Sequence, residues 1–402
     1  MSDSQWLRSR EVVERVIITG RLVLETPTSF GNGDTDGLTD IALSRDPLDG
    51  APLLTGASIA GALRNYLREY ERGFGWAEQK EAPVKSYAEL LFGHLTVDDD
   101  PVVENRRIKA TVQSWLMIDD ALGTHAGVEL RDGVAIEAKT RTAEEHKKYD
   151  LELLAAGTTF DICFELWLTE KGKGDERLLA ALVTALRGLE GDEIGMGQRK
   201  RRGFGQCRVE GWHTRRYAMA TPQGLLDWLD DKDTGQEGLP DTASLEKDAR
   251  REIHLTATFA LESSLLIRSE SGTGTSPDMV HLRSKRNGKS APAPVLSGTS
   301  LAGVIRGRAM RIANTILGVK IGDDLVDDMF GRRIESNEDI PSGSRIIVKE
   351  TELNGGNANL VQNRVKIDRF TGGAYPTALF SQQPVWSTAS NQATFKLDLK
   401  LR

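Results

Sequence analysis

Apolar and polar residues alternate along several stretches of the chain, and other stretches have helical spacing. Residues 16–25, 114–119 and 158–169 are rich in β-forming residues or alternate in character, which predicts β-strands. Residues 175–189 place apolar side chains at helical spacing and predict an amphipathic helix. Residues 128–149 have strand-like ends around a charged middle, which predicts a projecting β-hairpin. The pattern therefore predicts an α+β protein.

One motif in this pattern occurs twice. Residues 54–64 have the sequence Leu-Thr-Gly-Ala-Ser-Ile-Ala-Gly-Ala-Leu-Arg, and residues 296–306 repeat it as Leu-Ser-Gly-Thr-Ser-Leu-Ala-Gly-Val-Ile-Arg. The first glycine can turn the chain, the serine can cap a helix, and the second glycine lets another group approach closely. A helix N-terminus with a nearby arginine suits phosphate, although for a single copy an ordinary surface helix is the simpler interpretation. The positions are Gly56, Ser58, Gly61 and Arg64 in the first copy and Gly298, Ser300, Gly303 and Arg306 in the second.

The similarity extends over both halves of the chain and predicts two domains. We expect a first domain at residues 1–220, an acidic linker at 221–251 and a second domain at 252–402. A β-α-β-β-α-β order in each predicts a ferredoxin-like fold. The second domain has no counterpart of the helix at 175–189 or of the loop after it. Either the sequence is part of a longer product, or another segment supplies these elements. The segments of the second domain that match the first are 253–262, 329–331, 344–348, 365–371 and 394–399.

Composition narrows the class of protein. The chain has 402 residues, of which 39% are hydrophobic and 28% charged, and no apolar run is long enough to span a membrane. Its two cysteines, Cys163 and Cys207, lack metal-ligand spacing, so we interpret them as reduced core thiols of a cytoplasmic protein. The net charge of −7 argues against a protein that coats nucleic acid nonspecifically. Basic residues are nevertheless concentrated in two segments, which is compatible with a cationic groove.

The first basic segment, residues 195–205, combines glycines with four consecutive cations. Glycines free backbone amides to face a phosphate, and the cations add positive charge, so the segment predicts a phosphate-binding loop. It lacks the Gly-Lys-Ser/Thr ending of a P-loop, and it does not open a helix as a dinucleotide fingerprint does. Its aromatic residue either stacks on a base or anchors the loop. The residues concerned are Arg199, Lys200, Arg201, Arg202 and Phe204.

The second basic segment contains Arg283, Lys285 and Arg286. We interpret it as a second phosphate track, with a mobile basic loop as the alternative. The six histidines lack metal-ligand spacing, and we interpret His281 as a surface residue.

The order of these features resembles the RAMP superfamily. It runs from a strand through a glycine-rich loop, an Asp-containing connection, the motif Pro-x-x-x-Gly-x-Ser-x-x-Gly-x-x-Arg, Phe-Gly and a hairpin to a late Gly-x-Gly loop. The resemblance covers nearly all of the first domain and most of the second. It is greatest for Csm/Cmr-type backbone subunits of type III CRISPR effector complexes. It implies a tandem fusion of two ferredoxin-like RAMP domains, whose palms and hairpin thumbs hold guide RNA by its backbone.

The resemblance also implies catalysis. In the family, an aspartate before the Gly-x-Ser helix cuts guide-paired target RNA with the help of a divalent metal, for which we expect Mg²⁺ or Mn²⁺. Carried over, the catalytic and metal-binding aspartates are Asp40 and Asp278. Asp278 lies four residues farther from its glycine than Asp40 does, and Asp34, Asp36 and Asp46 are rival candidates in the first domain.

The resemblance implies a cytoplasmic endoribonuclease whose partners are guide RNA, target RNA and other effector subunits. Within it, we expect Ser58, Arg64, Ser300 and Arg306 to hold guide RNA rather than to do chemistry. Two alternatives remain open. One is a non-catalytic guide-RNA-binding scaffold of the same complex, and the other is a small-molecule enzyme built on duplicated α+β domains.

Overall fold

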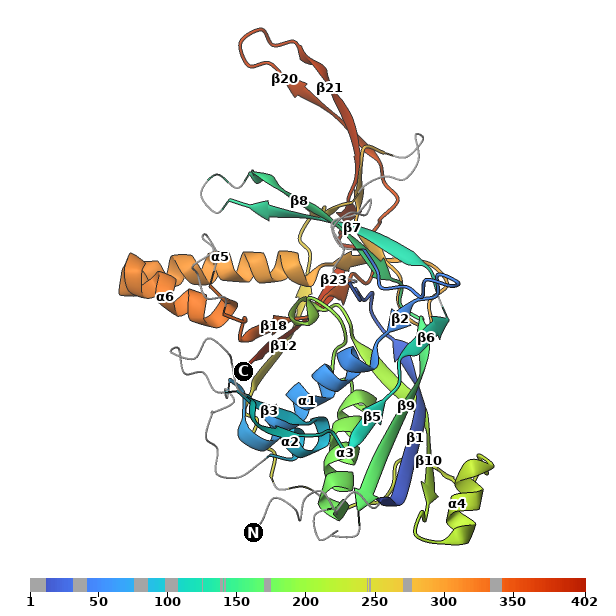
Figure 1. The fold of residues 1–402 in the computed structure, drawn as a ribbon. Helices are drawn as coiled ribbons and strands as arrows, with labels where there is room; N and C mark the ends of the chain where they lie inside the picture. Colours follow the sequence, from blue (N-terminus) through green and yellow to red (C-terminus); the bar gives the residue numbers. More distant parts are fainter. Residues whose placement is uncertain are drawn as a thin grey trace.

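The fold is taken from a computed structural model of the chain (Figure 1). It describes residues 12–31, 42–75, 86–97, 108–124, 126–137, 140, 142–169, 175–243, 245, 247–269, 277–332 and 342–402. We call the part that ends with Glu237 repeat one and the part that begins with Ile253 repeat two.

Repeat one is built on an antiparallel sheet. Its central strand β1 (Val12–Leu24) lies between β9 (Thr159–Thr169) and β10 (Cys207–Tyr217), and β5 (Leu116–Ile118) pairs with the far side of β9. The order β10-β1-β9-β5 is that of a ferredoxin-like unit, because each crossover helix returns the chain to the same sheet. The short strands β2 (Leu53–Leu54) and β6 (Ala121–Thr124) extend the sheet beyond β9.

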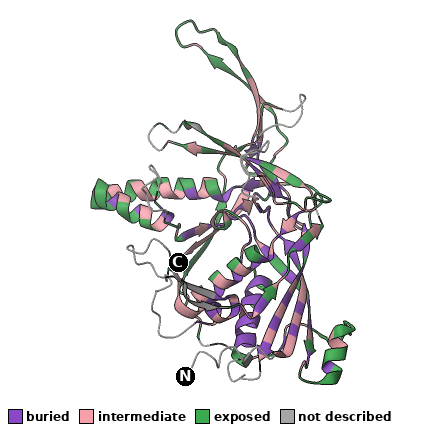
Figure 2. Ribbon diagram, in the orientation of Figure 1, coloured by how far each residue is buried: buried purple, intermediate pink, exposed green. Residues whose placement is uncertain are grey.

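Three helices of repeat one lie together on one face of this sheet (Figure 1). They are α1 (Gly56–Arg72), α2 (Tyr87–Phe92) and α3 (Asp175–Glu190), and they contact one another. The inward side chains of the strands and helices are fully buried, among them Ile18, Phe164, Leu63 and Leu186. Figure 2 shows that most buried residues of the chain belong to this sheet and to the helices that cover it. The predicted helix at 175–189 and the predicted strands of this half are confirmed.

The sheet of repeat two has counterparts of three of the four strands β10, β1, β9 and β5. Strand β23 (Thr394–Leu401) lies between β12 (Ile253–Ala260) and β18 (Ile346–Val348), matching the order β1-β9-β5. The helices α5 (Gly298–Leu317) and α6 (Val319–Phe330) pack against it. In the described part of repeat two, no strand stands where β10 stands in repeat one. The chain is thus an α+β protein whose two repeats agree with the predicted ferredoxin-like fold.

Long hairpins extend from both repeats (Figure 1). In repeat one the hairpin is β7 (Val128–Ile136) with β8 (Ala143–Leu154), and in repeat two it is β20 (Gln362–Ile367) with β21 (Ala374–Gln383). Both were predicted from their sequences. The remaining short strands are β3 (His94–Val97), β4 (Ile108–Val112), β13 (Ser264–Leu265), β14 (Arg268–Ser269), β15 (Met279–His281), β16 (Arg283–Ser284), β17 (Ala293–Leu296), β19 (Thr351–Glu352) and β22 (Val385–Trp386).

The acidic connection packs against repeat one. In helix α4 (Pro222–Leu229), Trp228 stacks on the guanidinium of Arg15, whose central carbon lies 4.3 Å from the ring centroid. Strand β11 (Gln236–Glu237) then pairs with β10 and adds an edge to the first sheet. Part of the segment expected as a linker therefore belongs structurally to repeat one, whereas the domain limits themselves remain a prediction.

The cap of each helix in the repeated motif lies three residues earlier than the sequence suggested. The caps are Thr55 and Ser297, whose hydroxyls accept from the N–H groups of Ser58 and Ser300. The predicted capping role of the two serines was therefore wrong, because these residues already lie within the first helical turn.

The glycines of the motif also differ from their expected roles. Gly298 lies within α5 and does not make a turn: a Cβ there would lie 2.1 Å from the Arg202 carbonyl oxygen and 2.5 Å from that of Val348. Gly56 in α1 is equally confined, with the Ile118 carbonyl 2.1 Å away. Gly61 and Gly303 are the positions expected to allow a close approach. A Cβ added at either one would have no atom of another segment within 4 Å. The close contacts therefore occur at the first glycine of each copy.

We predict that Gly298→Ala destabilises the protein by about 2 kcal/mol or more, because the methyl group must displace two backbone segments. Chemical denaturation measures the change. Gly303→Ala is the matched control on the same helix, and it should be neutral or stabilising by up to about 1 kcal/mol, since its surroundings are open. Equal stabilities of the two variants would contradict this packing.

Candidate nucleic-acid interface

A buried carboxylate joins the two repeats. The side chain of Glu350 is fully buried and accepts from Arg131 of β7 at 3.2 Å and from Arg286 at 2.6 Å. Arg131 and Arg286 are themselves about nine-tenths buried. Since each charge would be costly to bury alone, the three groups are mutually required. They attach the first hairpin to repeat two.

The second basic segment takes part in this junction. Arg286 pairs with Glu350, while the backbone N–H of Lys285 donates to Glu129 at 2.6 Å and its ammonium donates to the Ala126 carbonyl at 3.0 Å. The guanidinium of Arg286 is buried in this conformation, and its contact with phosphate stays a prediction. Arg283 alone of the three predicted cations is exposed.

The glycine-arginine loop lies at the same junction. It contains a short 3₁₀ turn, Lys200–Arg202, and its Gly203 lies so close to repeat two that a Cβ would meet the Glu350 nitrogen at 2.2 Å. Arg199 is tied to the first hairpin, where it donates to the Tyr149 hydroxyl at 2.5 Å and covers its ring at 4.2 Å. The loop therefore bridges the first hairpin and the start of α5.

Phe204 anchors this loop. Its ring is 6% exposed and packs with Leu151 and Leu153 of β8. The Arg131 guanidinium covers it at 5.7 Å. Of the two roles expected from the sequence, this packing agrees with anchoring of the loop, and base stacking stays a prediction.

Arginines from both repeats are brought together beside the loop. Burial lowers the pKa of Arg202, and the nearby charges of Arg306 and Arg201 lower it further. The pKa of Arg201 is likewise lowered, first by burial and then by Arg402. Such shifts arise where like charges are gathered with too little anionic compensation. These four arginines, which we call the junction cluster, have the electrostatics of an anion site.

Two nitrogen donors of the junction cluster, Nη1 of Arg202 and Nε of Arg402, have no acceptor among the residues that the structure describes. Nη1 of Arg202 is buried and makes no hydrogen bond to any residue that the structure describes. Arg306 is partly neutralised by Asp327 of α6, at 2.6 Å. Lys200, the remaining cation of the predicted loop, is exposed. The structure thus brings the loop arginines and Arg306 together, a proximity across the repeats that the sequence did not indicate.

The start of α1 is less suited to phosphate than expected. The Gly56 N–H donates to the carboxylate of Asp120 at 2.7 Å, so an anionic group already occupies one donor of this helix terminus. Ser58 is exposed beside it and Arg64 is half-buried farther along the helix. In α5 the Ser300 hydroxyl lies 2.9 Å from that of Ser297.

Asp278 is exposed and held against the second hairpin. Its carboxylate accepts from the N–H of Ser381 at 2.7 Å and from the Ser381 hydroxyl at 3.0 Å. These bonds, the backbone bond foremost, lower the pKa of Asp278. The residue is therefore an ionised carboxylate, kept in one orientation by strand β21.

The other candidate aspartates give less information. Asp40, Asp34 and Asp36 lie outside the residues that the structure describes. Asp46 belongs to a tight turn, in which its carbonyl accepts from the Gly50 N–H at 2.9 Å. Within the described ranges no three histidine, cysteine or acidic side chains are grouped as metal ligands.

His281 is a core residue and not the surface residue expected. It is 3% exposed, its Nδ1 accepts from the Ile267 N–H at 3.1 Å, and its Nε2 lies 3.1 Å from the Val295 carbonyl. This geometry requires the neutral imidazole, with the proton on Nε2. Burial lowers the pKa of His281 accordingly.

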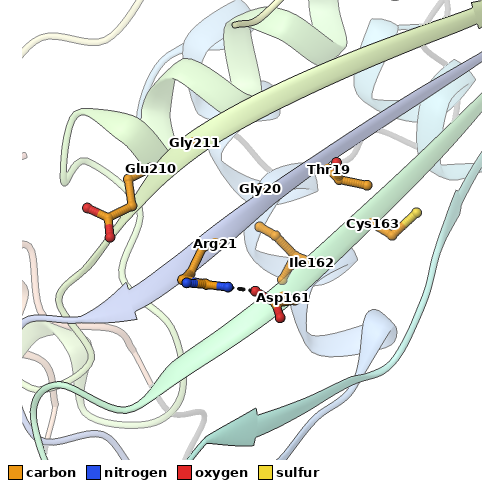
Figure 3. A pocket seen from close by; sticks show the side chains of 8 residues that line it. All are labelled: Thr19, Gly20, Arg21, Asp161, Ile162, Cys163, Glu210 and Gly211. Atoms are coloured by element: carbon orange, nitrogen blue, oxygen red, sulfur yellow. Dashed lines mark hydrogen bonds and ion pairs between the residues drawn. The ribbon is translucent and has the colours of Figure 1, made fainter. Parts of the chain in front are cut away.

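The two cysteines occupy different environments. Cys207 is fully buried, as expected, whereas Cys163 is only partly buried. Cys163 lines a shallow cavity of about 620 Å³ on the outer face of the first sheet, beside an exposed pair of Arg21 and Asp161 at 2.9 Å (Figure 3). None of the predicted RNA-binding or catalytic residues that the structure describes lines this cavity.

A comparison with protein-family models gives one match. The model described as the RAMP superfamily matches residues 21–208 and 265–399, one region in each repeat. No curated protein matches the chain. In the described part of the chain, no helix has the length and apolarity needed to cross a membrane.

We predict that repeat two loses stability as the pH falls through about 6.5, the usual pKa of histidine. The unfolded chain then binds a proton at His281 that the folded state does not bind, at a cost approaching about 1.4 kcal/mol per pH unit. Denaturation of the wild type and of His281→Gln between pH 7.5 and pH 5 tests this, with pH values chosen around that midpoint. The variant should show a shallower decline, and identical declines would contradict the assignment.

Proposed function

The chain belongs to the RAMP superfamily, and we propose that it is a guide-RNA-binding backbone subunit of a type III CRISPR effector complex. Proteins of this family act with RNA in multisubunit CRISPR complexes. The observation that carries the RNA-binding role is the junction cluster, in which Arg201, Arg202 and Arg306 meet with a buried donor left unpaired. A phosphate group supplies both the negative charge and the acceptor that this cluster lacks.

The RNA path follows from the position of the cluster. The loop that carries Arg201 and Arg202 touches the start of α5 and is tied to the first hairpin through Arg199. Guide RNA bound there runs between the repeats, beneath the two projecting hairpins (Figure 1). Lys200 and Arg283 provide exposed cations on either side of the junction, and Ser300 a hydroxyl on α5.

We also propose that the subunit cuts target RNA paired to the guide, at one aspartate in each repeat. Asp278 supports this because it is ionised, exposed and oriented by a hairpin strand. The assignment of Asp40 rests on the family resemblance alone. Regular spacing of the two cuts follows from the repetition of the unit.

A single carboxylate fits a divalent ion of the Mg²⁺ or Mn²⁺ type, since Mg²⁺ is commonly held by one or two carboxylates together with phosphate oxygens and water. Such an ion, when bound, supplies charge stabilisation at the scissile phosphate. In this arrangement Asp278 holds the ion and Ser381 orients the carboxylate through two hydrogen bonds. In this proposal the second hairpin, from which Ser381 projects, separates the paired strands for in-line attack.

The alternative is a scaffold of the same complex that does not cut. It is favoured by the absence of a group of three metal-type ligands in the described ranges, and by the bonds that already engage one oxygen of Asp278. A small-molecule enzyme predicts no bound RNA, and the ultraviolet absorbance ratio of the purified assembly tests that.

We expect Arg202→Gln to weaken guide-RNA binding and to lower the slope of log affinity against log salt by about 1, because one phosphate contact is lost. Filter binding across a salt series measures both quantities. Arg21→Gln is the matched control, since Arg21 is an exposed arginine paired with Asp161 on the outer sheet face. If the slope of log affinity against log salt is the same for Arg202→Gln as for wild type, the junction cluster does not contact guide RNA.

We expect Asp278→Asn to slow one of two regularly spaced cuts in target RNA by about 10²-fold or more and to leave guide binding intact. Gel analysis of end-labelled target in Mg²⁺ or Mn²⁺ follows each cut separately. Asp368→Asn is the control, because Asp368 is an exposed hairpin-tip carboxylate with a similarly lowered pKa and similar hydrogen bonds. If Asp278→Asn makes both cuts at the wild-type rate, the result supports the non-catalytic scaffold for repeat two.

A further inference from the structure

Strand β15 is fixed at one end by a buried histidine. His281 is its last residue, and the imidazole Nδ1 accepts from the N–H of Ile267, which precedes β14, at 3.1 Å. Its Nε2 donates to the carbonyl of Val295 in β17 at 3.1 Å. The ring thus joins three segments of repeat two, and we call this pair of hydrogen bonds the β15 latch. Because His281 is 3% exposed, a bond that is lost there is not replaced by water.

Asp278 stands at the other end of the same strand. It immediately precedes β15, its N–H donates to the Ser381 hydroxyl at 3.0 Å, and its carboxylate accepts from Ser381. Met279 and Val280 pair in parallel with residues 382 and 383 of β21. Since β15 has three residues and few backbone hydrogen bonds, the latch and β21 together fix where Asp278 lies.

Repeat one has a leucine at the position of His281. Leu43 forms a bridge with Gly31, as His281 pairs with Arg268. In both repeats the next residue donates its N–H to the carbonyl before the bridge partner, at 2.6 and 2.8 Å. Leu43 is 3% exposed, the same as His281. The two repeats therefore share the geometry of this loop and differ in whether the buried side chain can be protonated.

Protonation of the ring is incompatible with the latch. A second proton would lie on Nδ1, which would then face the N–H of Ile267 with two donors opposed. The imidazolium would also be buried, which is costly for a charge without a partner. If β15 separates from its neighbours, the ring reaches water and binds the proton freely. Acid therefore favours release of the strand.

The groups around the ring agree with this direction. Burial lowers the pKa of His281, and the charge of Arg283 lowers it further. Hydrogen bonding to the carbonyls of Val295 and Leu265 raises the pKa in part, and the net direction is downward. Arg268, opposite the ring in the ladder, is an exposed cation, and β17 has the uncharged sequence Ala-Pro-Val-Leu. No carboxylate of the described residues is among the causes of the shift.

We propose that neutral His281 is a positioning residue for Asp278, and that its protonation releases β15 and with it the aspartate. The effect on catalysis rests on the proposed cleavage at Asp278, whereas the latch itself does not involve RNA. Repeat one, with Leu43, keeps its geometry in acid, so the two proposed cuts differ in pH dependence. The carboxylate of Asp278 stays ionised between pH 7.5 and pH 5.5, because its hydrogen bonds to Ser381 lower its pKa.

Amide hydrogen exchange of the full chain tests the latch without any cleavage. After correction for the intrinsic exchange rate at each pH, we expect protection of residues 278–282 to fall about tenfold between pH 7.5 and pH 5.5. Residues 42–45 of repeat one should keep constant protection. In His281→Gln the side chain does not titrate, so residues 278–282 should lose this pH dependence. His254→Gln is the matched control, because His254 is an exposed histidine paired with Asp398, and it should behave as wild type.

The ratio of the two cuts in one target RNA measures the consequence for Asp278. Asp278→Asn first identifies the cut that belongs to repeat two. In the wild type we expect that cut to slow by about threefold or more relative to the other between pH 7.5 and pH 5.5. His281→Gln should keep the ratio constant, and His254→Gln should follow the wild type.

Two outcomes overturn the proposal. One is constant protection of residues 278–282 in the wild type, which requires no variant to fold. The other is protection that falls while the ratio of the cuts stays constant, because Asp278 would then not depend on the latch. Protection that falls while neither cut is made would support the latch and contradict the proposed cleavage, so the two failures are distinguishable.

Discussion

Burial of the Glu350 carboxylate between two arginines is the interaction on which the arrangement of the repeats depends. Arg131 comes from the first hairpin, and Arg286 from the second basic segment. Removing Glu350 leaves the largely buried Arg131 and Arg286 with more distant carboxylates, Glu129 at 3.3 Å and Glu352 at 3.8 Å, which costs more than the loss of an exposed pair. The triad therefore favours one relative position of the repeats, although a well-packed apolar junction could be as stable.

The position of the loop follows from this junction. Gly203 lies against Glu350, and Arg202 lies above Gly298 at the start of α5. Only glycine fits at either contact, because a Cβ would overlap backbone atoms of the other repeat. The loop arginines are thereby held next to Arg306, where their mutual repulsion is offset only in part by Asp327. An anion bound there would relieve that repulsion, which couples RNA binding to the joining of the repeats.

Much of the fold could be predicted because its signals are local. Alternation predicted β9, helical spacing predicted α3, and a charged middle between strand-like ends predicted the first hairpin. The repeated motif located α5, and the described part of repeat two contains no counterpart of α3. The roles within the motif were predicted less well, since whether a glycine turns the chain or admits a neighbour depends on groups distant in sequence. Gly298 meets Arg202 and Val348, which no local pattern connects.

The sequence by itself determined the duplication, the strand and helix types and the family resemblance, because periodicity and motif order act over short distances. Tertiary structure alone determined whether each charged or aromatic residue is buried or exposed and which groups it contacts. Arg286, Phe204 and His281 are buried and Arg202 has a buried donor unpaired, although all four belong to polar segments of the chain. Burial depends on which segments meet across the repeats, and a carboxylate such as Glu350 selects its partners only after the chain has folded.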